Sequence, residues 1–173
     1  MQNLIFFETE EHQTPHENGQ AFLAEIQKLR TQWKIIHEFK PTEYLHGPEA
    51  ISQKPPVSLV FGEEKSFGLG RGYIGIAFAL VNGAWVYSIH GDDQSMRFVQ
   101  IDQLPKIGEW TKIEISQKEE NGRFFLSFTV GGNVVRREDV TDTKLMNPTN
   151  VKILFGQSDS QPGFIRKLVL LEK

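Results

Sequence analysis

The sequence lacks cysteine, since none of its 173 residues carries a thiol. Disulfides therefore play no part in the fold, and cysteine-based nucleophilic chemistry is excluded. Such an absence suits a reducing compartment. A sandwich domain of this length can be stable without disulfides, however, so cysteine content leaves the compartment open.

Long apolar runs are missing as well. No stretch reaches the roughly 18 apolar residues that a membrane-spanning helix needs, so we expect no membrane span. Residues 1–10, MQNLIFFETE, also lack the basic start, the longer apolar stretch and the small-residue cleavage site of a secretory signal peptide.

The chain has no excess of one charge sign. Its 19 Lys and Arg stand against 22 Asp and Glu, which gives a net charge of -3, and the basic residues are spread along the sequence. A protein that binds a phosphate backbone carries a basic stripe or patch, so nucleic acid is not an expected partner. The length suits one domain with a single core.

Aromatic residues are abundant, with 13 Phe, three Tyr and three Trp, and they occur in short runs with Val and Ile that are typical of strands. Residues 33–39 alternate with a period of two, and Pro41 ends the run. One face of this strand carries Trp33, Ile35, His37 and Phe39. Asn82-Gly83, a strong hairpin signal, lies between the apolar runs 73–80 and 85–89.

The second half of the chain repeats this pattern more clearly. In residues 110–115 one face carries Trp110, Lys112 and Glu114, and the other carries Thr111, Ile113 and Ile115. Asn121-Gly122 and Gly131-Gly132 mark two further turns around the apolar run 124–130. About ten short strands without helices between them predict an antiparallel sandwich or barrel.

One segment fits a strand poorly. Phe22, Leu23, Ile26 and Leu29 recur at helical spacing, and Asn18 can cap a helix that starts at Gly19. The pattern alone slightly favours one short helix near residues 19–30 over a strand.

Several phrases resemble an animal family of concanavalin A-like domains related to laminin G modules. They are Trp33-Lys34-Ile35, Leu104-Pro105, the segment GEWTKIEISQ at residues 108–117, Gly131-Gly132 and the segment GFIRKL at residues 163–168. The likeness spans roughly residues 20–173. Most matching positions are strands and turns, which indicate the fold and not a ligand.

The resemblance implies an all-β jelly roll of two curved antiparallel sheets at residues 19–173, preceded by an N-terminal strand and polar arm at residues 1–18. It implies that Leu4 to Phe7 pairs beside the final strand, and it moves residues 20–29 toward a strand. Members of the family are extracellular recognition modules for sugars or proteins, some with calcium at the sheet rim. An extracellular location is therefore the expectation that the resemblance suggests.

Catalytic signatures are weak. Residues 70–75 match G-x-G-x-x-G by letters, but a strand follows where a dinucleotide site needs a helix, so a turn or bulge is the better interpretation. Glycosidases of this fold place paired carboxylates on one strand as E-x-D-x-E, and no E-x-D occurs. With no G-x-S-x-G either, we expect a protein that is not an enzyme.

Sugar binding needs an aromatic face for the C–H groups of the ring and polar groups for its hydroxyls. One predicted hairpin region supplies both kinds of side chain: Arg71, Tyr73, Trp85, Tyr87, His90 and Arg97. Asp92 and Asp93 follow this hairpin and are the best acidic pair for a calcium ion, although Gly-Asp-Asp also suits an ordinary solvated turn.

The competing interpretation of each aromatic residue is core packing. Trp33 and Trp110 are expected in the core, and Trp85, beside an Asn-Gly turn, fits either role. The leading hypothesis is a module that binds a glycan or glycoprotein. The alternative is a structural or self-associating protein, forming for example a homo-oligomer, whose sheet edge or N-terminal arm pairs with another chain.

Overall fold

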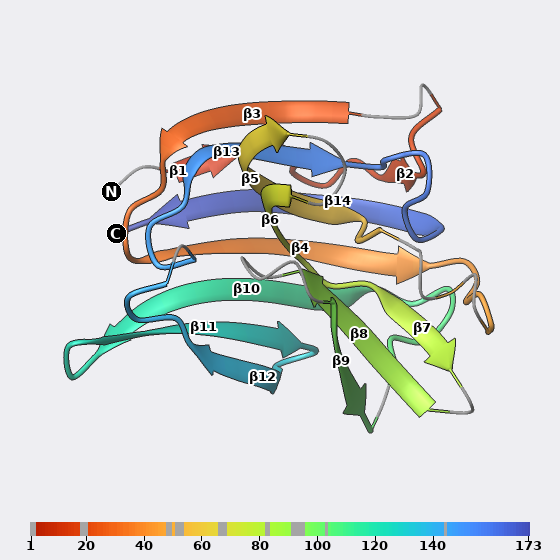
Figure 1. Cartoon of the computed structure of the whole chain (residues 1–173). Helices are drawn as coiled ribbons and strands as arrows, with labels where there is room; N and C mark the ends of the chain where they lie inside the picture. The colour runs from red at the N-terminus through yellow and green to blue at the C-terminus, as the bar shows by residue number, and fades with distance from the viewer. Residues whose placement is uncertain are drawn as a thin grey trace.

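The computed structural model describes residues 3–17, 21–47, 50, 54–65, 69–81, 84–90, 96–102, 104–143 and 145–173. It is a sandwich of two antiparallel sheets, each with seven strands in the described part of the chain (Figure 1). The ring of Phe39 in one sheet stacks on the ring of Phe78 in the other, with centroids 6.4 Å apart. The prediction of an all-β sandwich is confirmed.

Sheet 1 contains the first and the last of the described strands. Its strands are β1 (Asn3–Ile5), β2 (His12–Thr14), β4 (Trp33–Pro41), β10 (Thr111–Glu120), β11 (Arg123–Val130), β12 (Asn133–Asp139) and β14 (Gly163–Glu172). Their order is β1-β14-β4-β10-β11-β12, and β2 also pairs with β14. Because Asn3 to Ile5 pairs with Leu171 to Val169, the expected pairing of the N-terminal strand with the final strand is confirmed.

Sheet 2 lies over the inner face of sheet 1. Its strands are β3 (Ala21–Lys28), β5 (Val57–Lys65), β6 (Leu69–Gly75), β7 (Phe78–Val81), β8 (Ala84–His90), β9 (Met96–Ile101) and β13 (Thr149–Phe155). Their order is β3-β13-β5-β6-β8-β7, with β9 on β8. β12 and β9 therefore belong to different sheets, and they come close to each other at one side of the sandwich.

The core lies between the sheets and follows the alternation seen in the sequence. On β4 the four residues predicted to share one face, Trp33, Ile35, His37 and Phe39, are all buried, and the intervening ones are partly exposed. Ile113 and Ile115 of β10 meet Leu59, Ile74 and Ile153 of sheet 2 in the same apolar cluster. Burial of these side chains is the main favourable term that holds the two sheets together.

The prediction of a short helix near residues 19–30 is wrong, because residues 21–28 form β3. Ala24 pairs with Ile153 and Phe22 with Leu154, so Leu23 is the extra residue of a β-bulge. The bulge interrupts the two-residue alternation. Leu29 lies just after the strand and is fully buried. Together with the bulge, its position gives the apolar residues the spacing of a helix.

Trp110 is not in the core, which corrects the expectation for this residue, whereas Trp33 is 3% exposed as expected. Trp110 is only partly buried and precedes β10 on the side of Lys112 and Glu114, outside the sandwich. The alternation predicted for residues 110–115 is confirmed by the buried side chains of Ile113 and Ile115. None of the described residues forms a helix able to cross a membrane.

Candidate functional site

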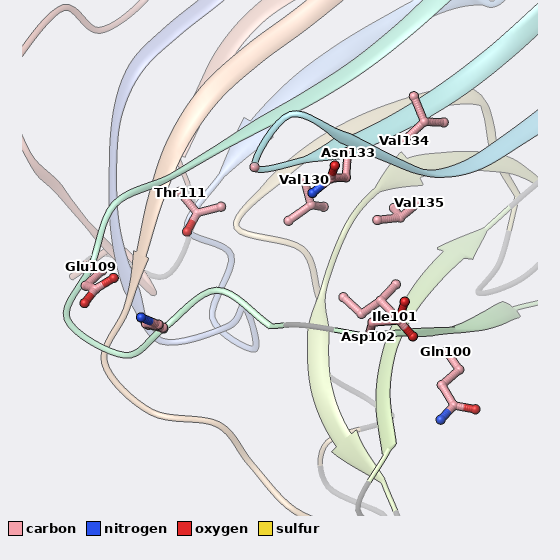
Figure 2. A pocket seen from close by; sticks show the side chains of 11 residues that line it. Gln100, Ile101, Asp102, Glu109, Thr111, Val130, Asn133, Val134 and Val135 are labelled. Carbon is pink, nitrogen blue, oxygen red and sulfur yellow. The ribbon is translucent and has the colours of Figure 1, made fainter.

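A groove of about 700 Å³ opens where the edge strands of the two sheets approach each other. β9 contributes one wall, the β11–β12 hairpin a second, and the loop before β10 a third (Figure 2). The lining residues are Gln100, Ile101, Asp102, Lys106, Glu109, Thr111, Val130, Gly131, Asn133, Val134 and Val135.

The groove has an aliphatic floor and a polar rim. Ile101 and Val130 are 6% and 8% exposed and belong to the core cluster, and Val135 is partly buried against it. The rim side chains Gln100, Asp102, Lys106, Glu109 and Asn133 are exposed. A ligand that fits this surface has apolar C–H faces together with several hydrogen-bonding groups.

The β11–β12 hairpin is shaped by its glycines. Val130 pairs with Asn133, so Gly131-Gly132 form a two-residue turn, as the sequence predicts. Their φ angles of +58° and +87° lie in the left-handed region that glycine adopts without steric cost. The tight turn places Asn133 at the mouth of the groove.

A bulge in β12 adjusts the strand just after this turn. Thr129 pairs with Val134 and Phe128 with Arg136, which leaves Val135 as the extra residue. A bulge bends and twists its strand and re-aims nearby side chains. Val135 lines the groove beside Val134 as a result.

The loop from Leu104 to Trp110 carries Lys106 and Glu109, and two hydrogen bonds tie it to the segment that ends β4. The Tyr44 hydroxyl donates to the carbonyl of Pro105 at 2.5 Å, and the backbone N–H of Gly108 donates to the carbonyl of Pro41 at 2.9 Å. Burial raises the pKa of Tyr44, so its hydroxyl stays protonated and able to donate. The third wall of the groove is therefore anchored to sheet 1.

A second polar cluster, on the outer face of sheet 1, is already satisfied by its own partners. The Trp110 ring has the Lys40 ammonium 4.7 Å and the Arg166 guanidinium 4.1 Å from its centroid. Lys40 binds Glu11 at 3.3 Å, and Arg166 and Lys167 bind Glu38 at 2.5 and 3.0 Å. Because these cations occupy the aromatic ring and the carboxylates, the cluster offers little to a ligand.

The rim of the groove differs in this respect. Within the described part of the chain, the side chains of Asp102, Lys106 and Glu109 form no ion pair or hydrogen bond. Three exposed charged groups thus line one hollow, and none of the three has a side-chain partner among the described residues. The groove is the candidate functional site for this reason.

Sequence reasoning did not select the rim residues, although it placed the candidate site on the adjoining strands. Trp85 pairs with Ile101 of the groove floor, and Tyr87 pairs with Val99. The six predicted ligand residues lie on three neighbouring strands, β6, β8 and β9. The structure describes the strand positions of these six residues but not their side chains. Their role in binding therefore stays a prediction.

The register divides these six positions into two sets. Tyr73 pairs with His90, and Arg71 lies two residues before Tyr73 on the same strand. Directly opposite residues, and residues two apart, belong to one face of a sheet. By the same rule Trp85, Tyr87 and Arg97 occupy the alternate positions of β8 and β9.

The predicted calcium ligands Asp92 and Asp93 lie outside the described residues. Among the residues that are described, no group of three His, Asp or Glu side chains is arranged to hold a metal ion. Calcium binding at the Asp pair therefore stays a prediction.

No protein-family model matches the chain, and no curated protein is similar to it in sequence. Solved structures, by contrast, share its fold. A heptameric SAP-like pentraxin from Limulus polyphemus has a TM-score of 0.57 at 10% identity, over 96% of this chain and 74% of that chain. The fold is a concanavalin A-like jelly roll.

Two further structures extend this family of folds. The Emp46p carbohydrate recognition domain, in metal-free form, has a TM-score of 0.53 at 12% identity, over 98% of this chain and 86% of that chain. Domains LG4-5 of the mouse laminin α1 chain have a TM-score of 0.50 at 18% identity, over 99% of this chain and 42% of that chain. The predicted concanavalin A-like and laminin G-like jelly roll is confirmed.

The fold does not by itself separate binding from catalysis. An endo-β-1,4-glucuronan lyase from the fungus Trichoderma reesei also shares it, with a TM-score of 0.52 at 9% identity, over 100% of this chain and 88% of that chain. The function has to be argued from the residues of the site.

Proposed function

We propose that this protein is a non-catalytic recognition module that binds a glycan, free or on a glycoprotein, in the groove between β9, the β11–β12 hairpin and the loop before β10. The observation that carries the proposal is the combination of an aliphatic floor with an unpaired polar rim. The C–H face of a sugar ring packs on Ile101, Val130 and Val135, and its hydroxyls bind the rim amides and charged groups.

The solved structures of the same fold support a carbohydrate ligand in general terms. One is a carbohydrate recognition domain and another is a lyase that acts on a glucuronan. Likeness at this level of identity concerns the fold, so the choice between binding and catalysis depends on the groove itself. A lumenal or extracellular location accompanies the proposal.

The carboxylates of the groove favour binding over hydrolysis. A glycosidase needs one carboxyl group that a shielded environment keeps protonated, beside a second that stays ionised. Asp102 and Glu109 are both exposed to solvent at the rim. They are suited to accept hydrogen bonds from sugar hydroxyls.

The proposal is tested by a glycan array followed by calorimetry on the glycans that bind. Gln100→Ala and Asn133→Ala each remove rim hydrogen bonds, and each is expected to weaken binding roughly two- to twelve-fold with an unchanged melting temperature. Gln27→Ala, an exposed amide on β3, is the matched control. Absence of saturable binding to any glycan overturns the proposal, and repetition with a chelator tests the predicted calcium.

The adjoining hairpin positions are tested in the same assay. Trp85→Ala is expected to weaken glycan binding in the groove while the fold stays intact, because its position shares a face with Ile101. Arg71 lies on the opposite face, so Arg71→Ala tests the sequence-predicted hairpin site separately from the groove. The reference is Trp33→Ala, a change in the core. If Trp85→Ala lowers the melting temperature as much as Trp33→Ala does, Trp85 is a core residue and is removed from the binding surface.

Self-association is the second candidate, and one observation favours it. Val134 is 61% exposed on β12, an edge strand of sheet 1, and exposed edge strands pair readily with other chains. Val134→Lys should convert an oligomer formed through this edge into a monomer by mass in solution. Deletion of residues 1–18 is a poorer test, because it removes β1, β2 and the buried Phe7.

A further inference from the structure

We infer that the groove selects its ligand by charge, and that it prefers glycans with basic amino sugars over neutral glycans and disfavours acidic ones. The inference rests on the proposed glycan-binding function and names the ligand class of the same groove.

The charged groups of the rim carry this inference. Asp102 follows β9, and Lys106 and Glu109 lie on the loop before β10, so two carboxylates stand against one ammonium and the lining set has a net charge of -1. Figure 2 draws Glu109 at one edge of the lining side chains and Asp102 apart from it, beside Ile101. A ligand laid along the groove can therefore meet both carboxylates.

These carboxylates are available to a ligand. Neither accepts a hydrogen bond from, or forms an ion pair with, any described residue. Glu38 and Glu11 on the outer face of sheet 1, by contrast, are both paired. An unpaired carboxylate accepts charge-assisted hydrogen bonds from an ammonium group and repels a uronate or sulfate group. Lys106 is free to bind a hydroxyl or carbonyl oxygen of the same ligand.

The rest of the groove does little to override this charge preference. Gln100, Thr111 and Asn133 are neutral groups that both donate and accept hydrogen bonds. The described lining residues include no aromatic ring. They therefore do not offer the ring stacking that would favour sugars regardless of charge. Charged contacts at the rim therefore decide which glycans bind more tightly.

The size of the effect follows from the exposure of these groups. Both carboxylates are exposed, and a solvent-exposed ion pair changes an equilibrium by roughly 1.5- to 5-fold. Two such pairs give a preference of about 2- to 25-fold for an amino-sugar glycan over its uncharged counterpart. The preference should shrink with added salt, since exposed charges are screened beyond about 8 to 10 Å at moderate ionic strength.

The experiment compares glycans that differ in charge. A chitosan oligosaccharide and the chitin oligosaccharide of equal length have the same backbone, but only the first has free amines, which are protonated at mildly acidic pH. An oligogalacturonate supplies the acidic member. Affinities of the full chain for all three are measured by calorimetry at low and at moderate salt.

Three variants and one control assign the effect to the groove. Asp102→Asn and Glu109→Gln keep the hydrogen-bonding shape but remove charge, so each should reduce the chitosan preference by roughly 1.5- to 5-fold. Lys106→Gln should increase that preference. Glu119→Gln removes an exposed carboxylate from the opposite end of β10 and should change nothing.

The outcomes separate this inference from the proposed function. Tighter binding of chitosan that depends on Asp102 and Glu109 supports it. Equal binding of all three glycans, or tighter binding of the oligogalacturonate, overturns the charge preference but leaves glycan binding standing if Gln100→Ala weakens it. Absence of binding to every glycan overturns both.

Discussion

The guanidinium carbon of Arg166 lies 4.1 Å from the centroid of the Trp110 ring, on the outer face of sheet 1. Lys40 of β4 approaches the same ring at 4.7 Å and also lies 5.1 Å from the Phe164 ring. Lys40 of β4 and Arg166 of β14 thus both contact the indole of Trp110, the residue directly before β10. The contact joins the loop that borders the groove to the centre of the sheet.

Trp110→Ala should destabilise the protein less than Trp33→Ala. Trp33 is 3% exposed within the core, where a large-to-small change costs about 3 to 5 kcal/mol. Trp110 loses two cation contacts at a partly exposed site, each worth about 0.5 to 1 kcal/mol, together with some surface packing. We expect about 1 to 2 kcal/mol for Trp110→Ala, measured by urea unfolding.

A double variant isolates the cation contacts. Arg166→Met keeps an aliphatic stem near the ring, and combining it with Trp110→Ala in a double-mutant cycle measures the coupling between the two residues. A cost for Trp110→Ala equal to that of Trp33→Ala, with no coupling to Arg166, would show that Trp110 is a core residue after all.

The sequence contained the information needed to place Trp110. Its alternation assigned Trp110 to the face of Lys112 and Glu114, opposite Ile113 and Ile115, and the structure has this arrangement. The expectation of a core residue did not use this alternation. Large aromatic residues also cover the outer face of a sheet where cations stack on them, as Arg137 does on Phe125 at 3.6 Å.

The strands and turns were predictable for a local reason. Gly131-Gly132 and the alternation of residues 33–39 depend on conformational preferences of a few neighbouring residues. Leu23 shows where local reasoning ends, because a bulge in β3 is recognised only from its pairing with β13. A long-range register decided that segment.

The groove could not be predicted in this way, because it depends on contacts between residues that are far apart in the sequence. Gln100, Glu109 and Asn133 belong to different elements, and they share one hollow only because the edges of the two sheets approach each other there. No short motif connects such positions. The aromatic hairpin, by contrast, was visible because its residues are close in sequence, and its strands do adjoin the groove floor through the pair of Trp85 and Ile101.

Tyr44→Phe should weaken glycan binding by loosening one wall of the groove. The change removes the hydrogen bond from the Tyr44 hydroxyl to Pro105 and leaves the ring in place. Lys106 and Glu109 follow Pro105 on the same loop, so their positions should become less defined. We expect a stability loss of about 0.5 to 1.5 kcal/mol and faster hydrogen exchange at the Gly108 amide.

Thr143→Val is the matched control for Tyr44→Phe. The Thr143 hydroxyl donates to the carbonyl of Val140 at 2.7 Å, in the turn beyond the far end of β12 from the groove. Both variants lose a side-chain hydrogen bond to a backbone carbonyl. Only Tyr44→Phe should lower glycan affinity, and equal affinities for the two variants would remove Tyr44 from the support of the site.

His37 should make the protein less stable as the pH falls. Its side chain is 3% exposed in the core of sheet 1, and both ring nitrogens lack a hydrogen-bond partner in the described structure. Burial lowers the pKa of His37 from 6.5 to about 3, because the core disfavours the charged imidazolium. Below pH 6.5 the unfolded chain therefore binds a proton that the folded chain does not.

The linkage fixes the sign and the range of the effect. Stability from the neutral imidazole is fully present above pH 6.5 and is lost toward pH 3, by at most about 1.4 kcal/mol per pH unit. Burial raises the pKa of Glu38, but hydrogen bonds from Arg166 and Lys167 outweigh it and lower that pKa below 4.5. Between pH 6.5 and 4.5 the loss of stability from His37 therefore exceeds that from Glu38, which falls mainly below pH 4.5.

His37→Leu tests this linkage, because it replaces an unpartnered buried polar ring with an apolar side chain. We expect unchanged or higher stability at neutral pH, since no buried polar group is left without a partner. In urea unfolding between pH 6.5 and 4.5 the variant should lose stability less steeply than the wild type. His46→Leu, which removes a histidine from an exposed position, is the matched control. If wild type and His37→Leu have equal slopes, the buried imidazole is not the source of acid sensitivity.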